Sequence, residues 1–89
     1  MNSPNFEGFI RGPDNSLYEH AVFRIKVIIP EDFPMIAPKI YFIDSIFHPN
    51  VNFETGEVCV DLLKENWNPT MTLYSLVIVL QYFMQEPNP

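Results

Sequence analysis

His48-Pro49-Asn50, Gly56-Glu57-Val58-Cys59-Val60-Asp61-Leu62-Leu63 and Trp67-Asn68-Pro69 are the three motifs from which the rest of this sequence can be interpreted. Cys59 is the only cysteine of the chain. A thiolate can take up an acyl group and hold it as a thioester. A neutral amide, such as the side chain of Asn50, can stabilise the oxyanion that forms when an amine attacks that thioester. The stretch therefore suits acyl transfer better than hydrolysis.

These motifs resemble the active-site region of ubiquitin-conjugating enzymes, where an HPN triplet precedes a Gly-x-[Ile/Val]-Cys motif and a tryptophan follows the cysteine by eight residues. Nine positions separate Asn50 from Cys59, one more than in much of the family, and the extra residue falls within Asn52-Phe53-Glu54-Thr55. Further segments resemble the same family: Ile10-Arg11-Gly12-Pro13, the run from Ile29 to Ile40, and Glu86-Pro87-Asn88-Pro89.

The resemblance implies a role for each motif residue. Cys59 would accept ubiquitin or a ubiquitin-like modifier as a thioester and pass it to a lysine or to a ligase, and Asn50 would stabilise the oxyanion. The residues that would order the active-site loop are His48, Pro49, Trp67 and Asp61. Those that would bind the ligase are Met35, Ile36, Pro69 and Thr70. The implied partners are the modifier, an activating enzyme of an ATP-dependent pathway, and a ubiquitin ligase.

Simpler interpretations exist for the same residues. Free cysteines are commonly buried and inert, so Cys59 could be a core residue. Asparagine is common in turns, and tryptophan commonly fills cores, so Asn50 and Trp67 also have structural interpretations. The same fold could also serve as a catalytically inert binding or regulatory module. This alternative stays open at the level of sequence.

Other catalytic classes are poorly supported. A cysteine protease needs a histidine that activates Cys59, and the only histidines are His48 and His20, the second of which lies in a predicted turn before a strand. One cysteine and two scattered histidines lack the spacing of a metal site, so we predict no metal and no cofactor.

Composition narrows the class of protein. The chain has 89 residues, a formal net charge of -6 and only five basic residues spread along the sequence, which argues against nucleic-acid binding. The longest apolar run, residues 76–80, is too short to span a membrane. A single cysteine allows no internal disulfide, and the N-terminus lacks the pattern of a secretory signal. We therefore expect a cytoplasmic or nuclear location.

Periodicity predicts strands at about residues 6–11, 22–29 and 39–43, and an irregular active-site loop over residues 44–71. A helix is predicted over residues 73–85, with Thr72 as its N-cap. The expected fold is α+β: an antiparallel β-meander of about four strands with the central helix packed on one face.

The predicted helix is apolar on nearly all sides, which favours burial on both faces. A small sheet covers only one face. The family core has an N-terminal helix and two further C-terminal helices that residues 1–89 do not contain. We therefore expect a single, incomplete core domain that self-associates through the exposed helix face.

Overall fold

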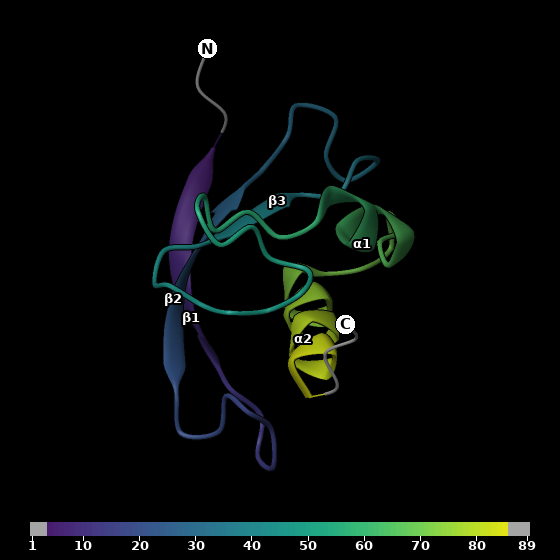
Figure 1. Ribbon diagram of the computed structural model, residues 1–89. Coiled ribbons are helices and arrows are strands. Elements are labelled where there is room, and N and C mark those ends of the chain that lie inside the picture. Colours follow the sequence, from purple (N-terminus) through teal and green to yellow (C-terminus); the bar gives the residue numbers. More distant parts are fainter. Residues whose placement is uncertain (1–3, 86–89) are drawn as a thin grey trace.

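The computed structural model describes residues 4–85 (Figure 1). In chain order its elements are β1 (Asn5–Arg11), β2 (Val22–Ile28), β3 (Lys39–Phe42), α1 (Val60–Glu65) and α2 (Leu73–Gln85). The proline-rich segment of residues 86–89 lies outside the described residues. The fold is α+β, as predicted from the sequence.

The three strands form one antiparallel sheet in the order β1-β2-β3. Its register pairs Ile25 with Phe42 and Val27 with Ile40, so the buried side chains of alternate residues face the core together. We expected about four strands, and the described residues contain three. A short extended segment runs beside β3 in place of a fourth: Phe42 N–H donates to the Gly56 carbonyl at 2.8 Å, and Val58 N–H donates to the Ile40 carbonyl at 2.9 Å.

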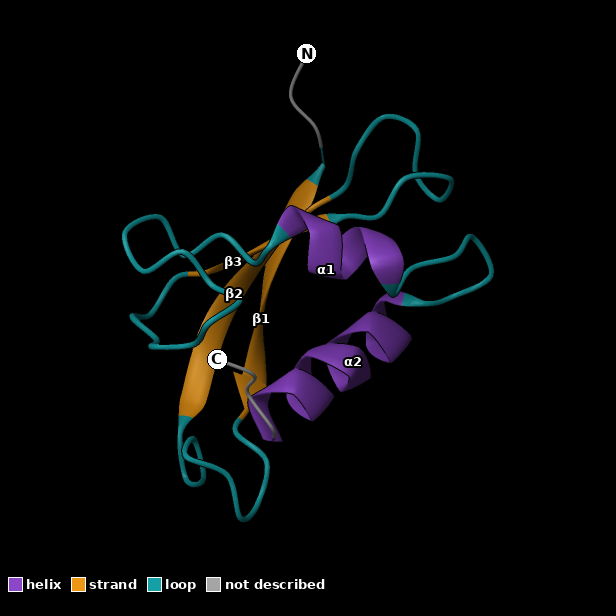
Figure 2. Ribbon diagram, turned by 45° about the vertical axis from the view of Figure 1, so that its right-hand side comes forward, coloured by secondary structure: helices purple, strands orange, loops and turns teal. Residues whose placement is uncertain are grey.

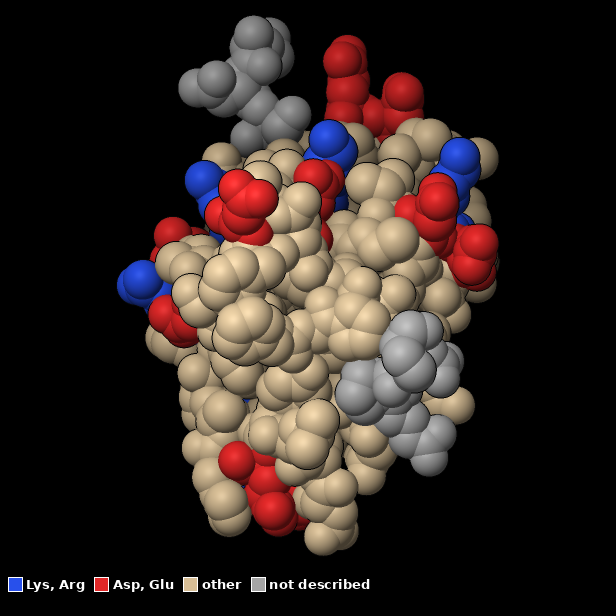
Figure 3. Space-filling model, in the orientation of Figure 1, with Lys and Arg blue, Asp and Glu red and all other residues tan. Residues whose placement is uncertain are grey.

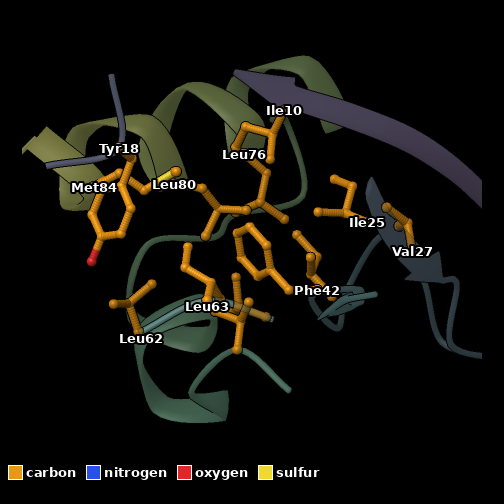
Figure 4. Close-up of a cluster of buried hydrophobic side chains, with 13 residues drawn as sticks. Ile10, Tyr18, Ile25, Val27, Phe42, Leu62, Leu63, Leu76, Leu80 and Met84 are labelled. Carbon is orange, nitrogen blue, oxygen red and sulfur yellow. The ribbon is translucent and has the colours of Figure 1, made fainter. Parts of the chain in front are cut away.

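Helix α2 packs across one face of this sheet (Figure 2). Leu76, Leu80 and Met84 are buried on its inner side. These side chains meet strand residues such as Ile10 and Ile25 in the core (Figure 4). Burial of this apolar stripe supplies most of the helix stability, because isolated helices of this length are marginal in water.

The N-terminus of α2 is capped as the sequence predicts. Thr72 Oγ1 accepts a hydrogen bond from Ser75 N–H at 3.1 Å. On the outer side of the helix, the predicted apolar face is open: Tyr74 is 74% exposed, Tyr82 is 65% exposed and Ile78 is also exposed. No helix within residues 4–85 combines the length and the apolar composition needed to cross a membrane.

The segment 44–71 is not irregular throughout, because α1 occupies Val60–Glu65. Our prediction of a continuous loop was wrong at these six residues. A helix of less than two turns gives too few repeats for a period of 3.6 residues to be recognised. It is held by tertiary packing, since Leu62 and Leu63 are both buried.

Candidate active site

His48 connects the turn before the active site to helix α2. Its Nδ1 accepts a hydrogen bond from Asn50 N–H at 3.0 Å. An accepting Nδ1 requires the proton on Nε2, which lies 2.8 Å from the Phe83 carbonyl and therefore donates to it. Phe83 belongs to the last turn of α2, where carbonyls have no partner within the helix. His48 thus orders the turn and satisfies the helix end at once.

Asn50 and Cys59 lie opposite each other on two adjacent stretches of backbone. Cys59 N–H donates to the Asn50 carbonyl at 2.7 Å, Val51 and Val58 form a bridge, and Asn52 N–H donates to the Glu57 carbonyl at 2.9 Å. Cys59 is exposed and directly precedes α1. Both residues line an open pocket of about 320 Å³. Cys59 is therefore not a buried core residue.

The turn after this ladder accommodates the extra residue of the sequence. The Oδ1 atom of Asn52 accepts from Glu54 N–H at 2.9 Å and from Thr55 N–H at 3.0 Å. Gly56 closes the turn with a φ of +79°, and a Cβ atom there would lie 2.1 Å from the Phe42 carbonyl oxygen. Only glycine fits this conformation and this close approach. The lengthened turn is therefore well ordered and leaves Asn50 bonded to Cys59.

An aromatic pair lies on the same loop, and we did not predict it. The rings of Phe47 and Phe53 stack with centroids 4.4 Å apart and an angle of 9° between planes. The Tyr18 hydroxyl donates to the Phe47 carbonyl. Burial raises the pKa of Tyr18 above its ordinary value of 10.0, so this hydroxyl remains a protonated donor to a higher pH than an exposed tyrosine would. Neither phenylalanine belongs to a periodic pattern, so the sequence gives no signal that would pair them.

Trp67 joins the two loops for which the family resemblance implied ligase binding. Its Nε1–H donates to the Pro34 carbonyl at 2.8 Å, and its ring packs against Phe33 at a centroid distance of 5.6 Å. Met35 and Ile36 follow Pro34 and are exposed, as are Pro69 and Thr70 beyond the tryptophan. A groove of about 340 Å³ runs between the first loop and α1.

The remaining candidates have simpler surroundings. Asp61 is exposed in the first turn of α1, and Pro49 lines the Cys59 pocket. Both ring nitrogens of His48 are already engaged, so His48 is not available as a base for Cys59, while His20 is exposed in a turn. Within residues 4–85, no three His, Cys, Asp or Glu residues lie close enough together to hold a metal ion.

Comparison with known proteins gives a consistent result. The family model described as "Ubiquitin-conjugating enzyme" matches residues 1–89. Ubiquitin-conjugating enzyme E2 N of Drosophila melanogaster is 38% identical over 88 residues, which are 99% of this chain and 58% of that protein. Protein PEROXIN-4 of Arabidopsis thaliana is 42% identical over 80 residues, 90% of this chain and 51% of that protein.

Solved structures agree. Pex4p of H. polymorpha, a ubiquitin-conjugating enzyme crystallised with the soluble domain of Pex22p, matches 96% of this chain and 59% of its own with a TM-score of 0.88 and 32% identity. Human ubiquitin-conjugating enzyme E2 G1 matches 93% of this chain and 70% of its own with a TM-score of 0.82 and 36% identity. The chain spans about half the length of the curated relatives that it matches.

Proposed function

This chain belongs to the ubiquitin-conjugating enzyme family, and we propose that it accepts ubiquitin or a ubiquitin-like modifier as a thioester on Cys59 and transfers it to a lysine or to a ligase. One observation carries the proposal: the exposed Cys59 shares an open pocket with Asn50, and a backbone hydrogen bond joins the two residues. Such a pair offers a nucleophile together with a neutral donor for the oxyanion.

The proposed chemistry has two acyl transfers. In the first, Cys59 Sγ attacks the C-terminal carbonyl of a modifier held as a thioester on the activating enzyme. A C–S bond to Cys59 forms, the C–S bond to the activating enzyme breaks, and the departing sulfur takes up the proton that Cys59 loses. In the second, an amine attacks the Cys59 thioester, a C–N bond forms, the C–S bond breaks, and the amine proton passes to solvent. In this second transfer an oxyanion exists after the amine attacks and before the C–S bond breaks, and the Asn50 side-chain amide donates a hydrogen bond to it. His48 holds Asn50 in place because its Nδ1 accepts a hydrogen bond from Asn50 N–H.

The partners follow from these steps. We propose an activating enzyme that depends on ATP, the modifier itself, and a ligase bound by Met35, Ile36, Pro69 and Thr70. The hydrogen bond from Trp67 to the Pro34 carbonyl supports a joint role for these two loops, because it fixes one against the other. We further propose that the protein acts in the cytoplasm or the nucleus.

A second candidate function, a catalytically inert binding module, is favoured by one observation. Tyr74, Ile78 and Tyr82 present an exposed apolar stripe on α2. Exposed stripes of this kind promote association, so we propose self-association through this helix face as well. Sedimentation of the wild type and of an Ile78→Asp variant tests it: a concentration-dependent increase in mass that is lost in the variant supports association. A monomer in both cases contradicts it.

Single-turnover discharge tests the catalytic proposal. The chain is charged with activating enzyme, ATP and ubiquitin, charging is stopped, and free lysine is added. We expect Asn50→Ala to retain the thioester and to slow its discharge by about 100-fold, the usual effect of losing one oxyanion donor. Gln81→Ala is the matched control, because it removes a side-chain amide that donates to the Arg11 carbonyl and lines neither the Cys59 pocket nor the ligase loops. An Asn50→Ala variant that discharges at the wild-type rate would exclude the proposed role of its amide.

A further inference from the structure

The stacked phenylalanines have no role in the core. Phe47 is 76% exposed and Phe53 is 55% exposed, and neither ring belongs to the buried cluster or packs at its edge. Their backbone is nevertheless held firmly. The Tyr18 hydroxyl binds the Phe47 carbonyl, and the neighbouring His48 binds α2. On the other side, the Asn52 turn fixes Phe53. The result is a rigid, exposed aromatic platform, defined here as Phe47 and Phe53.

This platform lies near the Cys59 pocket along the chain, and Asn52 links the two regions. Phe53 is three residues beyond Asn50, so their Cα atoms lie at most about 11 Å apart. Asn52 lines the Cys59 pocket and also a second hollow of about 90 Å³ that Phe53 lines. Cys59 is hydrogen-bonded to Asn50, so a chain segment that presents an amine beside these two residues needs about three extended residues, at about 3.3 Å each, to cover the separation from Asn50 to Phe53.

The surroundings carry negative charge. Glu57 lines the Cys59 pocket, and Asp44 and Glu54 line the hollow beside Phe53. Of the described residues, no lysine or arginine lines either one. On the molecular face shown in Figure 3, charged side chains lie across the upper part and along the sides, acidic atoms also lie near the lower end, and the middle is uncharged. The carboxylates around the Cys59 pocket and the hollow beside Phe53 therefore favour a bound segment that is apolar, uncharged or basic, and they disfavour an acidic one.

We propose that the platform selects the acceptor: it binds an apolar side chain about three residues from the acceptor lysine, in a segment that lacks acidic neighbours. The inference rests on the proposed transfer from Cys59 and names the substrate class of that site. Phe47 and Phe53 act by positioning the acceptor segment, while Asn50 and Cys59 carry out the transfer. Apolar contact with two rings selects the side chain, and the carboxylates set the charge preference.

Peptide acceptors test this inference. Each peptide contains a single lysine with leucine three residues to either side. One control peptide has serine in place of leucine, and another has glutamate beside the lysine. Single-turnover discharge of the charged chain to each peptide is divided by its discharge to free lysine. We expect the leucine peptide to react about tenfold faster than the serine and glutamate peptides. This factor is at the low end of the rate discrimination that one apolar contact provides, because the platform is exposed.

Substitutions assign the preference to the platform. Phe53→Ala removes one ring, and the ratio of leucine to serine peptide is expected to fall toward one. The matched control is Phe9→Ala, which removes an exposed phenylalanine from β1, on the sheet face away from the core. Its ratio is expected to stay at the wild-type value. Trp67 fluorescence reports whether each variant is folded.

The outcomes separate the two proposals. Equal rates for the leucine and serine peptides, with discharge to free lysine intact, overturn the selection inference and leave the proposed function standing. A leucine preference that survives in folded Phe53→Ala also overturns it. A chain that is folded but forms no thioester overturns the proposed function and the inference together.

Discussion

His48 makes two hydrogen bonds that substitutions can separate. Its Nδ1 accepts from Asn50 N–H at 3.0 Å, and its Nε2 lies 2.8 Å from the Phe83 carbonyl. An asparagine at this position can place its amide near the site of Nδ1 but cannot reach α2. A glutamine can reach the helix with a donor but leaves Asn50 N–H without its acceptor. His48→Asn, His48→Gln and His48→Ala therefore form a graded set.

The magnitudes follow from the bonds lost. One hydrogen bond contributes about 1 kcal/mol net, and leaving a buried partner unsatisfied costs about 1–3 kcal/mol. The half-buried position of His48 places each single loss near 1–2 kcal/mol. His48→Ala removes both bonds and the ring contact with Tyr18, whose centroid lies 5.9 Å away, so about 2–4 kcal/mol is expected.

Urea unfolding followed by Trp67 fluorescence measures these values, and lysine discharge measures their effect on the site. We expect His48→Gln to slow discharge because Asn50 is released, whereas His48→Asn lowers stability with a smaller effect on discharge. Equal discharge rates in folded His48→Asn and His48→Gln would refute the separation of roles. A loss below about 0.5 kcal/mol in His48→Ala, the range typical of neutral surface changes, would refute the connection to α2.

Three further predictions concern stability. Gly56→Ala forces a Cβ to 2.1 Å from the Phe42 carbonyl at a φ of +79°, so unfolding free energy is expected to fall by at least about 1–2 kcal/mol in urea titration. Leu76→Ala leaves a cavity at a fully buried position and is expected to lower the unfolding free energy by about 3–5 kcal/mol in the same assay. A decrease of less than about 1 kcal/mol would contradict the core packing. Burial raises the pKa of Tyr18 above 10.0, so the folded state holds this proton more tightly than the unfolded state. The contribution of the protonated Tyr18 hydroxyl to the unfolding free energy is therefore present below pH 10 and is lost as the pH rises through the folded pKa. Urea titrations above about pH 10 should show a smaller decline in Tyr18→Phe than in the wild type, and an identical decline would contradict this assignment.

Local patterns predicted the main elements of the fold. Helix α2 occupies Leu73–Gln85, the predicted range, because Thr72 signals its start and the apolar period runs through its whole length. The strands lie within one residue of the predicted bounds, since alternation defines them well. Helix α1 could not be predicted, because six residues show no sustained period.

The candidate site was predictable as a list of residues but not as a geometry. The sequence motifs nominated Cys59 and Asn50 as candidates, yet the backbone bond between them depends on the turn closed by Gly56. The bond from His48 to Phe83 joins residues 35 positions apart, and sequence periodicity carries no information on such a contact. The same holds for the stacking of Phe47 on Phe53.

The most direct test of the account is whether the modifier becomes attached to the Cys59 sulfur. The wild type, Cys59→Ser and Cys59→Ala are incubated with activating enzyme, ATP and ubiquitin, and products are separated on non-reducing gels with and without dithiothreitol. We predict a dithiothreitol-sensitive adduct in the wild type, a resistant ester in Cys59→Ser, and none in Cys59→Ala. A folded wild-type chain without an adduct, or an adduct that persists in Cys59→Ala, would contradict the account.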